Sequence, residues 1–100
     1  MTTVPTQQSA TLNPGESAQF QTSPSVNQIL AITNSSTQEA AQVQINCPSW
    51  GSDKPSMPIT ISPYNSYSHT KILGGASMLI VNVTNPNNPA TVQTTLSVVG

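Results

Sequence analysis

The sequence has very few charged side chains and no arginine. Charged residues make up 5% of its 100 residues, with a net charge of −1, whereas an average soluble domain has about 25% charged residues. The two lysines, Lys54 and Lys71, lie far apart in the chain. Because nucleic-acid binding normally needs clustered Lys or Arg to displace counterions from phosphates, we expect no nucleic-acid partner.

The sequence also lacks a second cysteine and any long apolar run. With Cys47 alone, no internal disulfide can form, so the core must hold the fold without this common support of small secreted domains. No segment approaches the roughly 18 apolar residues of a membrane-spanning helix, and we expect no membrane span. Residues 1–5 lack the basic end and apolar run of a signal peptide, which leaves the localisation open.

Few groups are available for catalysis or for metal binding. His69 is the only histidine, and the acids are limited to Glu16, Glu39 and Asp53. Hydrolysis needs a nucleophile, a base and an orienting group in one place, and Ser68 precedes His69 on a predicted strand, where neighbours point to opposite faces. The acids and His69 match neither zinc nor EF-hand spacing. We therefore expect no catalytic residue, no metal, no cofactor and no enzyme activity.

What the sequence does contain is a repeated alternation of apolar and polar residues. Residues 41–46 and 92–99 alternate with a period of two, which is typical of strands with one face in a core and one in water. The β-branched segment 78–84 lies between turn residues and predicts a central strand. Shorter candidates of the same character bring the expected total to about eight strands: 29–33, the surroundings of Leu12, 18–20, 59–61 and 67–72.

Turn-forming clusters with nine prolines separate these segments. Their spacing predicts an antiparallel β-sandwich, Ig-like or jelly-roll-like, formed by residues 1–100 as a single domain. The segment 36–41 also fits a helix-capping box followed by helix formers. A single helical turn there is compatible with the sequence, but the alternation from Ala41 onward favours a strand.

The chain also contains signs of an internal duplication. Residues 12–17, Leu-x-Pro-x-x-Ser, recur as residues 61–66, Ile-x-Pro-x-x-Ser, and the motif Ala-x-Val-Gln recurs at 41–44 and 90–93. Ile32-Thr33-Asn34 further resembles Val83-Thr84-Asn85. These matches predict two four-stranded halves, 9–47 and 57–99, which are joined by loop 48–56 and related by an approximate twofold.

Candidate ligand-binding residues lie in two aromatic segments. Trp50, the only Trp, shares a Ser- and Gly-rich loop with Asp53 and could stack on a sugar face while Asp53 accepts hydrogen bonds. The alternative, favoured by how often aromatics serve the core, is that Trp50 covers one end of the sandwich. Tyr64 and Tyr67, near His69, predict either a second polar-aromatic surface or packing on a strand end.

These features predict a binding protein. Neutral faces rich in Asn, Thr, Ser and Gln, the loop Trp and the duplication indicate a non-catalytic, lectin-like domain for carbohydrate or cell-surface glycans. The alternative is a self-assembling coat, decoration or adhesion subunit. Because few lysines protect the sheet edges, we expect a homo-oligomer. Two glycosylation sequons begin at Asn34 and Asn82, but this composition produces such triplets readily, and a strand position makes Asn82 a poor acceptor.

Overall fold

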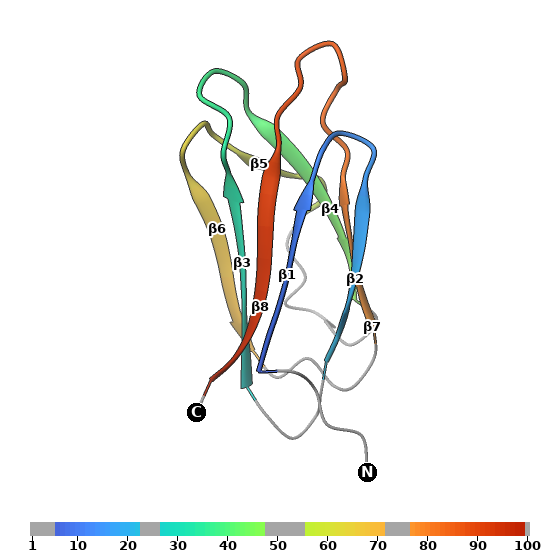
Figure 1. Ribbon diagram of the computed structural model, residues 1–100, viewed down its shortest axis with the longest axis vertical. Helices are drawn as coiled ribbons and strands as arrows, with labels where there is room; N and C mark the ends of the chain where they lie inside the picture. Colours follow the sequence, from blue (N-terminus) through green and yellow to red (C-terminus); the bar gives the residue numbers. More distant parts are fainter. Residues whose placement is uncertain (1–5, 23–26, 48–55, 72–76, 100) are drawn as a thin grey trace.

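The computed structural model describes residues 6–22, 27–47, 56–71 and 77–99, and within them every regular element is a β-strand (Figure 1). The connection 35–40 forms bends instead of a helical turn. Ser36 Oγ accepts hydrogen bonds from the backbone N–H groups of Gln38 (3.4 Å) and Glu39 (3.2 Å), as in a helix cap, but the chain becomes extended at Ala41. The eight strands are β1 Gln7–Leu12, β2 Ser17–Gln21, β3 Asn27–Asn34, β4 Ala41–Asn46, β5 Ile59–Ile61, β6 Ser66–Lys71, β7 Ser77–Asn82 and β8 Val92–Val99.

The strands form two antiparallel four-stranded sheets that pack face to face. One sheet has the order β1-β8-β3-β6 and the other has the order β2-β7-β4-β5. The predicted antiparallel β-sandwich of about eight strands is therefore confirmed. This order is that of an eight-stranded jelly roll, so the structure decides between the two sandwich types that the sequence left open.

The core lies between the sheets and is formed by the inward-facing residues of the strands, in which inward and outward positions alternate. On β3, for example, the inward positions are buried while their neighbours face outward, because successive strand residues point to opposite faces. Cys47 is a free thiol within this core. The buried apolar residues are Leu12, Phe20, Leu30, Ile32, Ala41, Val43, Ile45, Cys47, Ile61, Met78, Ile80, Ala90, Val92 and Leu96.

The outward faces of both sheets are almost free of charge. Across one sheet, hydroxyl and amide side chains stand in register, as in the row Thr11, Gln93, Thr33 and Ser66. Among the strand residues whose side chains the structure describes, no outward position carries a charged residue. The other sheet has an exposed apolar stripe along β7, one of its two inner strands. The stripe consists of Leu79 (37% exposed), the half-buried Val81 and, just past the end of β7, Val83 (41% exposed).

The two halves of the chain correspond strand by strand. The first four strands, β1 to β4, correspond to the last four, β5 to β8, in the same order along the chain. When each strand in the order β1-β8-β3-β6 is replaced by its counterpart, the result is β5-β4-β7-β2, which is the order of the other sheet in the reverse direction. Registers agree in the same way: Ile32 pairs with Thr94 and Tyr67, and its counterpart Ile80 pairs with Ile45 and Ala18. The register of β1 with β8 differs by two residues from that of β5 with β4. Leu12 lies opposite Val92, whereas Ile61, the counterpart of Leu12, lies opposite Ala41 and not opposite Val43, the counterpart of Val92.

This correspondence supports the predicted duplication, which remains a proposal because the jelly-roll topology itself has this symmetry. One of the predicted matches is wrong in register. Ile32 is buried within β3, whereas Val83 is exposed and lies after β7 has ended. The residue equivalent to Asn34 is Asn82, at a shift of 48, and both are fully buried at the end of their strands.

Candidate functional site

Four chain connections meet at one end of the sandwich (Figure 1). They are the turns 13–16 and 62–65 and the longer connections 35–40 and 83–91. Connections at the end of a β-sandwich carry function more often than the sheets do, because they vary without disturbing the core. We call this end, defined by these four connections, the loop end.

The loop end is organised around the buried side chain of Asn82. Its Nδ2 group donates hydrogen bonds to the carbonyl oxygens of Leu12 (2.9 Å) and Ala90 (2.8 Å). Its Oδ1 accepts a hydrogen bond from the backbone N–H of Thr84 (3.0 Å) and a second from the Thr84 hydroxyl. One side chain therefore joins β1, the end of β7 and the connection just before β8, and leaves no amide group available for another purpose.

Asn34 does the same in the other half of the chain. Its Nδ2 donates to the carbonyl oxygens of Ile61 (2.9 Å) and Glu39 (2.8 Å), and its Oδ1 accepts from the N–H of Ser36 (2.9 Å). The sequons at Asn34 and Asn82 are therefore structural motifs. In each, the Asn side chain accepts a hydrogen bond from the backbone N–H two residues later, at the Ser or Thr of the sequon, and this bond turns the chain. Buried and fully bonded amides are not glycosylation acceptors in the folded state.

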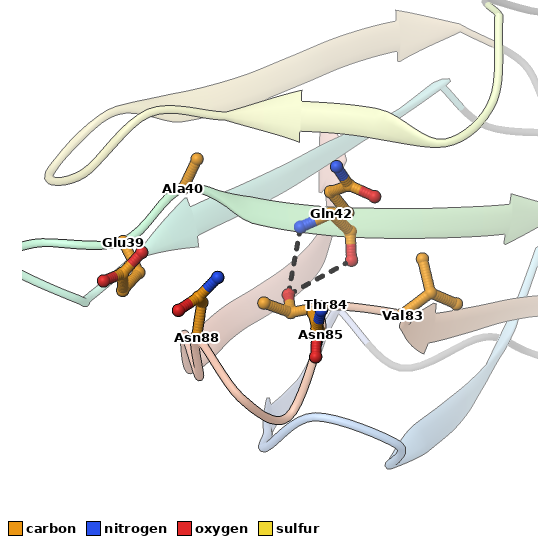
Figure 2. A pocket seen from close by; sticks show the side chains of 7 residues that line it. All are labelled: Glu39, Ala40, Gln42, Val83, Thr84, Asn85 and Asn88. Atoms are coloured by element: carbon orange, nitrogen blue, oxygen red, sulfur yellow. Dashed lines mark hydrogen bonds between the residues drawn. The ribbon is translucent and has the colours of Figure 1, made fainter.

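A pocket of about 410 Å³ opens at the loop end, between the connection 35–40 with the start of β4 on one side and the connection 83–91 on the other. Its size falls in the lower part of the range of small-molecule sites, roughly 300–1,000 Å³. Figure 2 shows the lining side chains, which are mostly polar and uncharged. They are Glu39, Ala40, Gln42, Val83, Thr84, Asn85 and Asn88.

Hydrogen bonds join the two sides of this pocket, between β4 and the start of the connection 83–91. The N–H of Val83 donates to the carbonyl of Gln42 (2.8 Å), and the N–H of Gln42 donates to the Thr84 hydroxyl (3.0 Å) (Figure 2). Asn85 begins a turn in which its Oδ1 accepts from the N–H of Asn87 (2.9 Å) and its carbonyl accepts from the N–H of Asn88 (2.9 Å). The pocket is thus formed on a fixed backbone.

Several polar groups of the lining remain available to a ligand. Thr84 is buried and its hydroxyl is engaged, and Asn85 uses its Oδ1 within the turn. Within the described residues, the side chains of Glu39, Gln42 and Asn88 have no hydrogen-bond partner apart from solvent. Two amides and one carboxylate supply both donors and acceptors, and Val83 supplies an apolar wall.

The structure places the predicted aromatic residues in different environments. Tyr64 lies in the turn 62–65 at the loop end and is 71% exposed. Tyr67 and His69 lie on the inward face of β6, in register with the buried Ile32 and Leu30, and Tyr67 packs against the core. Tyr64 therefore belongs to the surface of the loop end, while Tyr67 contributes to packing.

Partial burial affects the titration of these inward groups. Desolvation raises the pKa of Tyr67 above its ordinary value and lowers the pKa of His69 below its ordinary value, because burial disfavours each charged form. Ser68 is exposed and in register with Ala31 on the outward face. Ser68 and His69 thus point to opposite faces, as predicted, and do not form a nucleophile and base pair.

Two predicted ligand residues, Trp50 and Asp53, lie outside the described residues. The pocket residues were not predicted, since a lining of Asn, Gln and Glu has no motif in a chain so rich in these types. One signal did exist: the Asn-x-Ser/Thr triplets at 34 and 82 mark the two strand ends next to the pocket. In the described part of the chain, no group of His, Cys, Asp and Glu side chains could hold a metal ion.

The sequence matches no known protein family and no curated protein. Among solved structures, the chain is similar to a de novo designed double-stranded β-helix determined by solution NMR, with a TM-score of 0.48 and 16% sequence identity over 93% of this chain and 97% of that chain. Among the described residues, no helix has the length and hydropathy needed to cross a membrane.

Proposed function

We propose that this protein is a non-catalytic carbohydrate-binding domain that holds a neutral sugar in the pocket at the loop end. The observation that carries the proposal is the composition of the pocket lining, which combines the polar residues Gln42, Asn88 and Glu39 with the apolar Val83. A sugar hydroxyl both donates and accepts hydrogen bonds, and a side-chain amide offers one group of each kind. A lining with one carboxylate and no cation disfavours anionic ligands.

The low charge around the pocket supports a neutral ligand. Glu16 and Glu39 are the only acidic residues within the described part of the chain. Association with a neutral sugar gains nothing from electrostatic steering, so affinity must come from hydrogen bonds and from contact with apolar groups. We therefore expect weak binding at a single site, which a protein of this kind strengthens by multivalent presentation.

The test is an array of neutral and anionic glycans probed with the wild-type protein and with a Gln42→Ala, Asn88→Ala double variant. We expect a group of neutral glycans to bind the wild type and to lose binding to the double variant, because two of the lining amides are removed. A matched control is the Gln19→Ala, Gln44→Ala double variant, which removes two outward amides away from the pocket. Absence of any glycan signal, or equal losses in both double variants, contradicts the proposal.

A second function, self-assembly as a coat, decoration or adhesion subunit, is favoured by the stripe of Leu79, Val81 and Val83. Leu79 and Val81 lie on β7, an inner strand of its sheet, and Val83 follows the end of this strand. Exposed apolar positions on a face with so little charge favour association. Light scattering across a concentration series tests this function. We expect oligomers that Leu79→Lys dissociates and that Thr95→Lys, on the opposite sheet, leaves intact; a monomer at every concentration contradicts it.

A further inference from the structure

Tyr64 occupies a backbone conformation that is unfavourable for a bulky side chain. It is the third residue of the turn 62–65, with φ of 62°, which is the left-handed region. For residues other than Gly, Asn and Asp this region is costly, because Cβ approaches the neighbouring carbonyl oxygen. Such residues persist where the surrounding structure holds them, and they are concentrated at functional positions.

The equivalent turn in the other half shows that the fold does not require a tyrosine here. The turn 13–16 has the same backbone, with Gly15 at φ of 87° in the place of Tyr64. Both turns have proline at the second position, and both have a hydrogen bond from the fourth residue to the first: Glu16 N–H to Asn13 O (2.9 Å), and Asn65 N–H to Ser62 O (3.0 Å). The turn 13–16 has a further bond, from the Asn13 N–H to Glu16 Oε1 (2.7 Å). Glycine satisfies this geometry at no conformational cost.

The Tyr64 ring does not compensate for this cost by packing. It is 71% exposed, more than Leu79 or Val83, and in the described part of the chain it is not among the side chains that pack against the core. Tyr67, three residues later, does pack there. An exposed aromatic ring that is held at an unfavourable backbone position and contributes nothing to the core is expected where the ring contacts another molecule.

The turn that presents Tyr64 is joined to the wall of the pocket. The N–H of Asn34 donates to the carbonyl of Asn65 (3.0 Å), and its Nδ2 donates to the carbonyl of Ile61 (2.9 Å), so that Asn34 holds both sides of the turn. The same Nδ2 donates to the carbonyl of Glu39 (2.8 Å), a residue of the pocket lining. One buried side chain therefore fixes the Tyr64 turn and the Glu39 wall relative to each other.

We propose that the Tyr64 ring is a contact surface for the sugar bound at the loop end, on which the apolar C–H face of a pyranose ring lies. The inference rests on the proposed carbohydrate-binding function and extends it to the shape of the ligand: an oligosaccharide that reaches from the pocket to the turn 62–65. Tyrosine suits this role because it offers a large rigid area with few rotatable bonds. The pocket amides bind the hydroxyl groups, and Tyr64 contacts the C–H groups that they leave exposed.

The test uses NMR signals from the tyrosine rings. The chain has two tyrosines, so ring labelling gives separate signals for the exposed Tyr64 and the packed Tyr67. The probes are methyl glucoside, methyl galactoside, methyl mannoside, cellobiose, lactose and mannobiose, together with the neutral glycans that bind on the array. We expect the Tyr64 ring and the side-chain amides of Gln42 and Asn88 to shift in the same titration, while the Tyr67 ring stays unchanged.

The possible outcomes separate this inference from the proposed function. If the amides of Gln42 and Asn88 shift and the Tyr64 ring does not, the carbohydrate function stands and the role of Tyr64 is overturned. If neither group shifts with any probe, both are overturned. If the Tyr64 ring shifts with protein concentration alone and not with sugar, its partner is a second copy of the chain, and the sugar contact is overturned.

Two substitutions supply an independent measure. Tyr64→Gly gives this turn the residue found in its counterpart, and we expect about tenfold weaker binding of the selected sugar, which is a common loss for a buried aromatic contact. We expect Tyr64→Phe to bind within about twofold of the wild type, because the ring face remains. Wild-type affinity in Tyr64→Gly overturns the inference. Circular dichroism and urea unfolding establish that the Gly variant is folded when its affinity is measured.

Discussion

The turns 13–16 and 62–65 have the same backbone but present different side chains. Gly15 presents no side chain to solvent, and a Cβ placed there would meet no atom within 4 Å. Tyr64, at the equivalent position, presents a ring that is 71% exposed. Because both turns have a positive φ at the third position, the backbone does not account for the difference between the two side chains. At the loop end, the turn 13–16 therefore contributes to the fold alone, whereas the turn 62–65 also presents a side chain that is available for binding.

The two halves of the chain also differ within the sheets. At one pair of equivalent buried positions, β4 and β8 have the same residue, Val43 and Val92. At the next pair, β4 has Ile45 and β8 has Thr94, whose buried hydroxyl has no hydrogen-bond partner within the described residues. On β2 and β6 the buried Phe20 corresponds to the half-buried His69. One half thus has apolar residues where the other has polar ones, and exchanging residues between the halves measures the cost of each difference.

The largest expected effect is at the paired asparagines. In Asn82→Ala, the carbonyls of Leu12 and Ala90 lose their donor and remain buried, so we expect a loss of about 4 kcal/mol in the free energy of unfolding. For Asn34→Ala we expect about 3 kcal/mol, because its bond to Glu39 is less buried. Urea unfolding followed by tryptophan fluorescence measures both. Asn85→Ala, an exposed control in the connection that follows Asn82, should change stability by under about 1 kcal/mol.

A smaller loss of stability is expected when the turn 13–16 is given the residue of the turn 62–65. Gly15→Tyr places a tyrosine at a left-handed position, and we expect about 1.5 kcal/mol of destabilisation. The open space around Gly15 means that the loss comes from backbone conformation and not from a clash. Gln19→Tyr, at an exposed strand position, is the control and should be nearly neutral. Equal stability of the two variants in urea unfolding is the result that contradicts this account.

A gain in stability is expected from making β8 more like β4. Thr94→Val replaces the buried hydroxyl, which lacks a partner in the described structure, by a methyl group of similar volume. Because a buried hydroxyl without a partner carries a desolvation cost, we expect about 1 kcal/mol of stabilisation, seen as a higher urea midpoint with unchanged slope. A lower midpoint indicates that the hydroxyl has a partner that supports the fold.

The smallest effect concerns pH. The pKa of His69 is lowered in the folded state by desolvation, so the unfolded state binds the proton more readily. Stability is therefore fully present above the ordinary value of 6.5 and decreases as the pH falls through 6.5 towards the lowered pKa. His69→Phe, which introduces the residue found at the equivalent position of β2, should remove this decrease. An unchanged pH dependence in the variant assigns the effect to other groups.

The sequence predicted the architecture well because alternation, turn residues and register all depend on local patterns. Residues 41–46 were predicted as a strand from alternation, and β4 has these bounds. The prediction for 78–84 was too long, since β7 ends at Asn82. The side chain of Asn82 bonds across the sheets to Leu12 and Ala90, and no local pattern specifies such a contact.

The candidate site was predicted less well, for a physical reason. Tyr64 was a candidate on its residue type, but its left-handed conformation becomes informative only beside Gly15, once the two turns are known to share a backbone. The pocket joins residues 39–42 to residues 83–88, which belong to different parts of the chain and contain common polar types. Neither spacing nor composition distinguishes them from the other Asn and Gln residues of the chain.

The most direct test of the central claim is to measure sugar affinity and unfolding free energy together in Tyr64→Gly. The account predicts weaker binding of the selected glycan and a free energy of unfolding that rises by about 0.5 kcal/mol, because relief of the left-handed strain exceeds the entropy cost of glycine. Unchanged affinity with a loss of stability contradicts it, since Tyr64 would then support the fold and not the ligand.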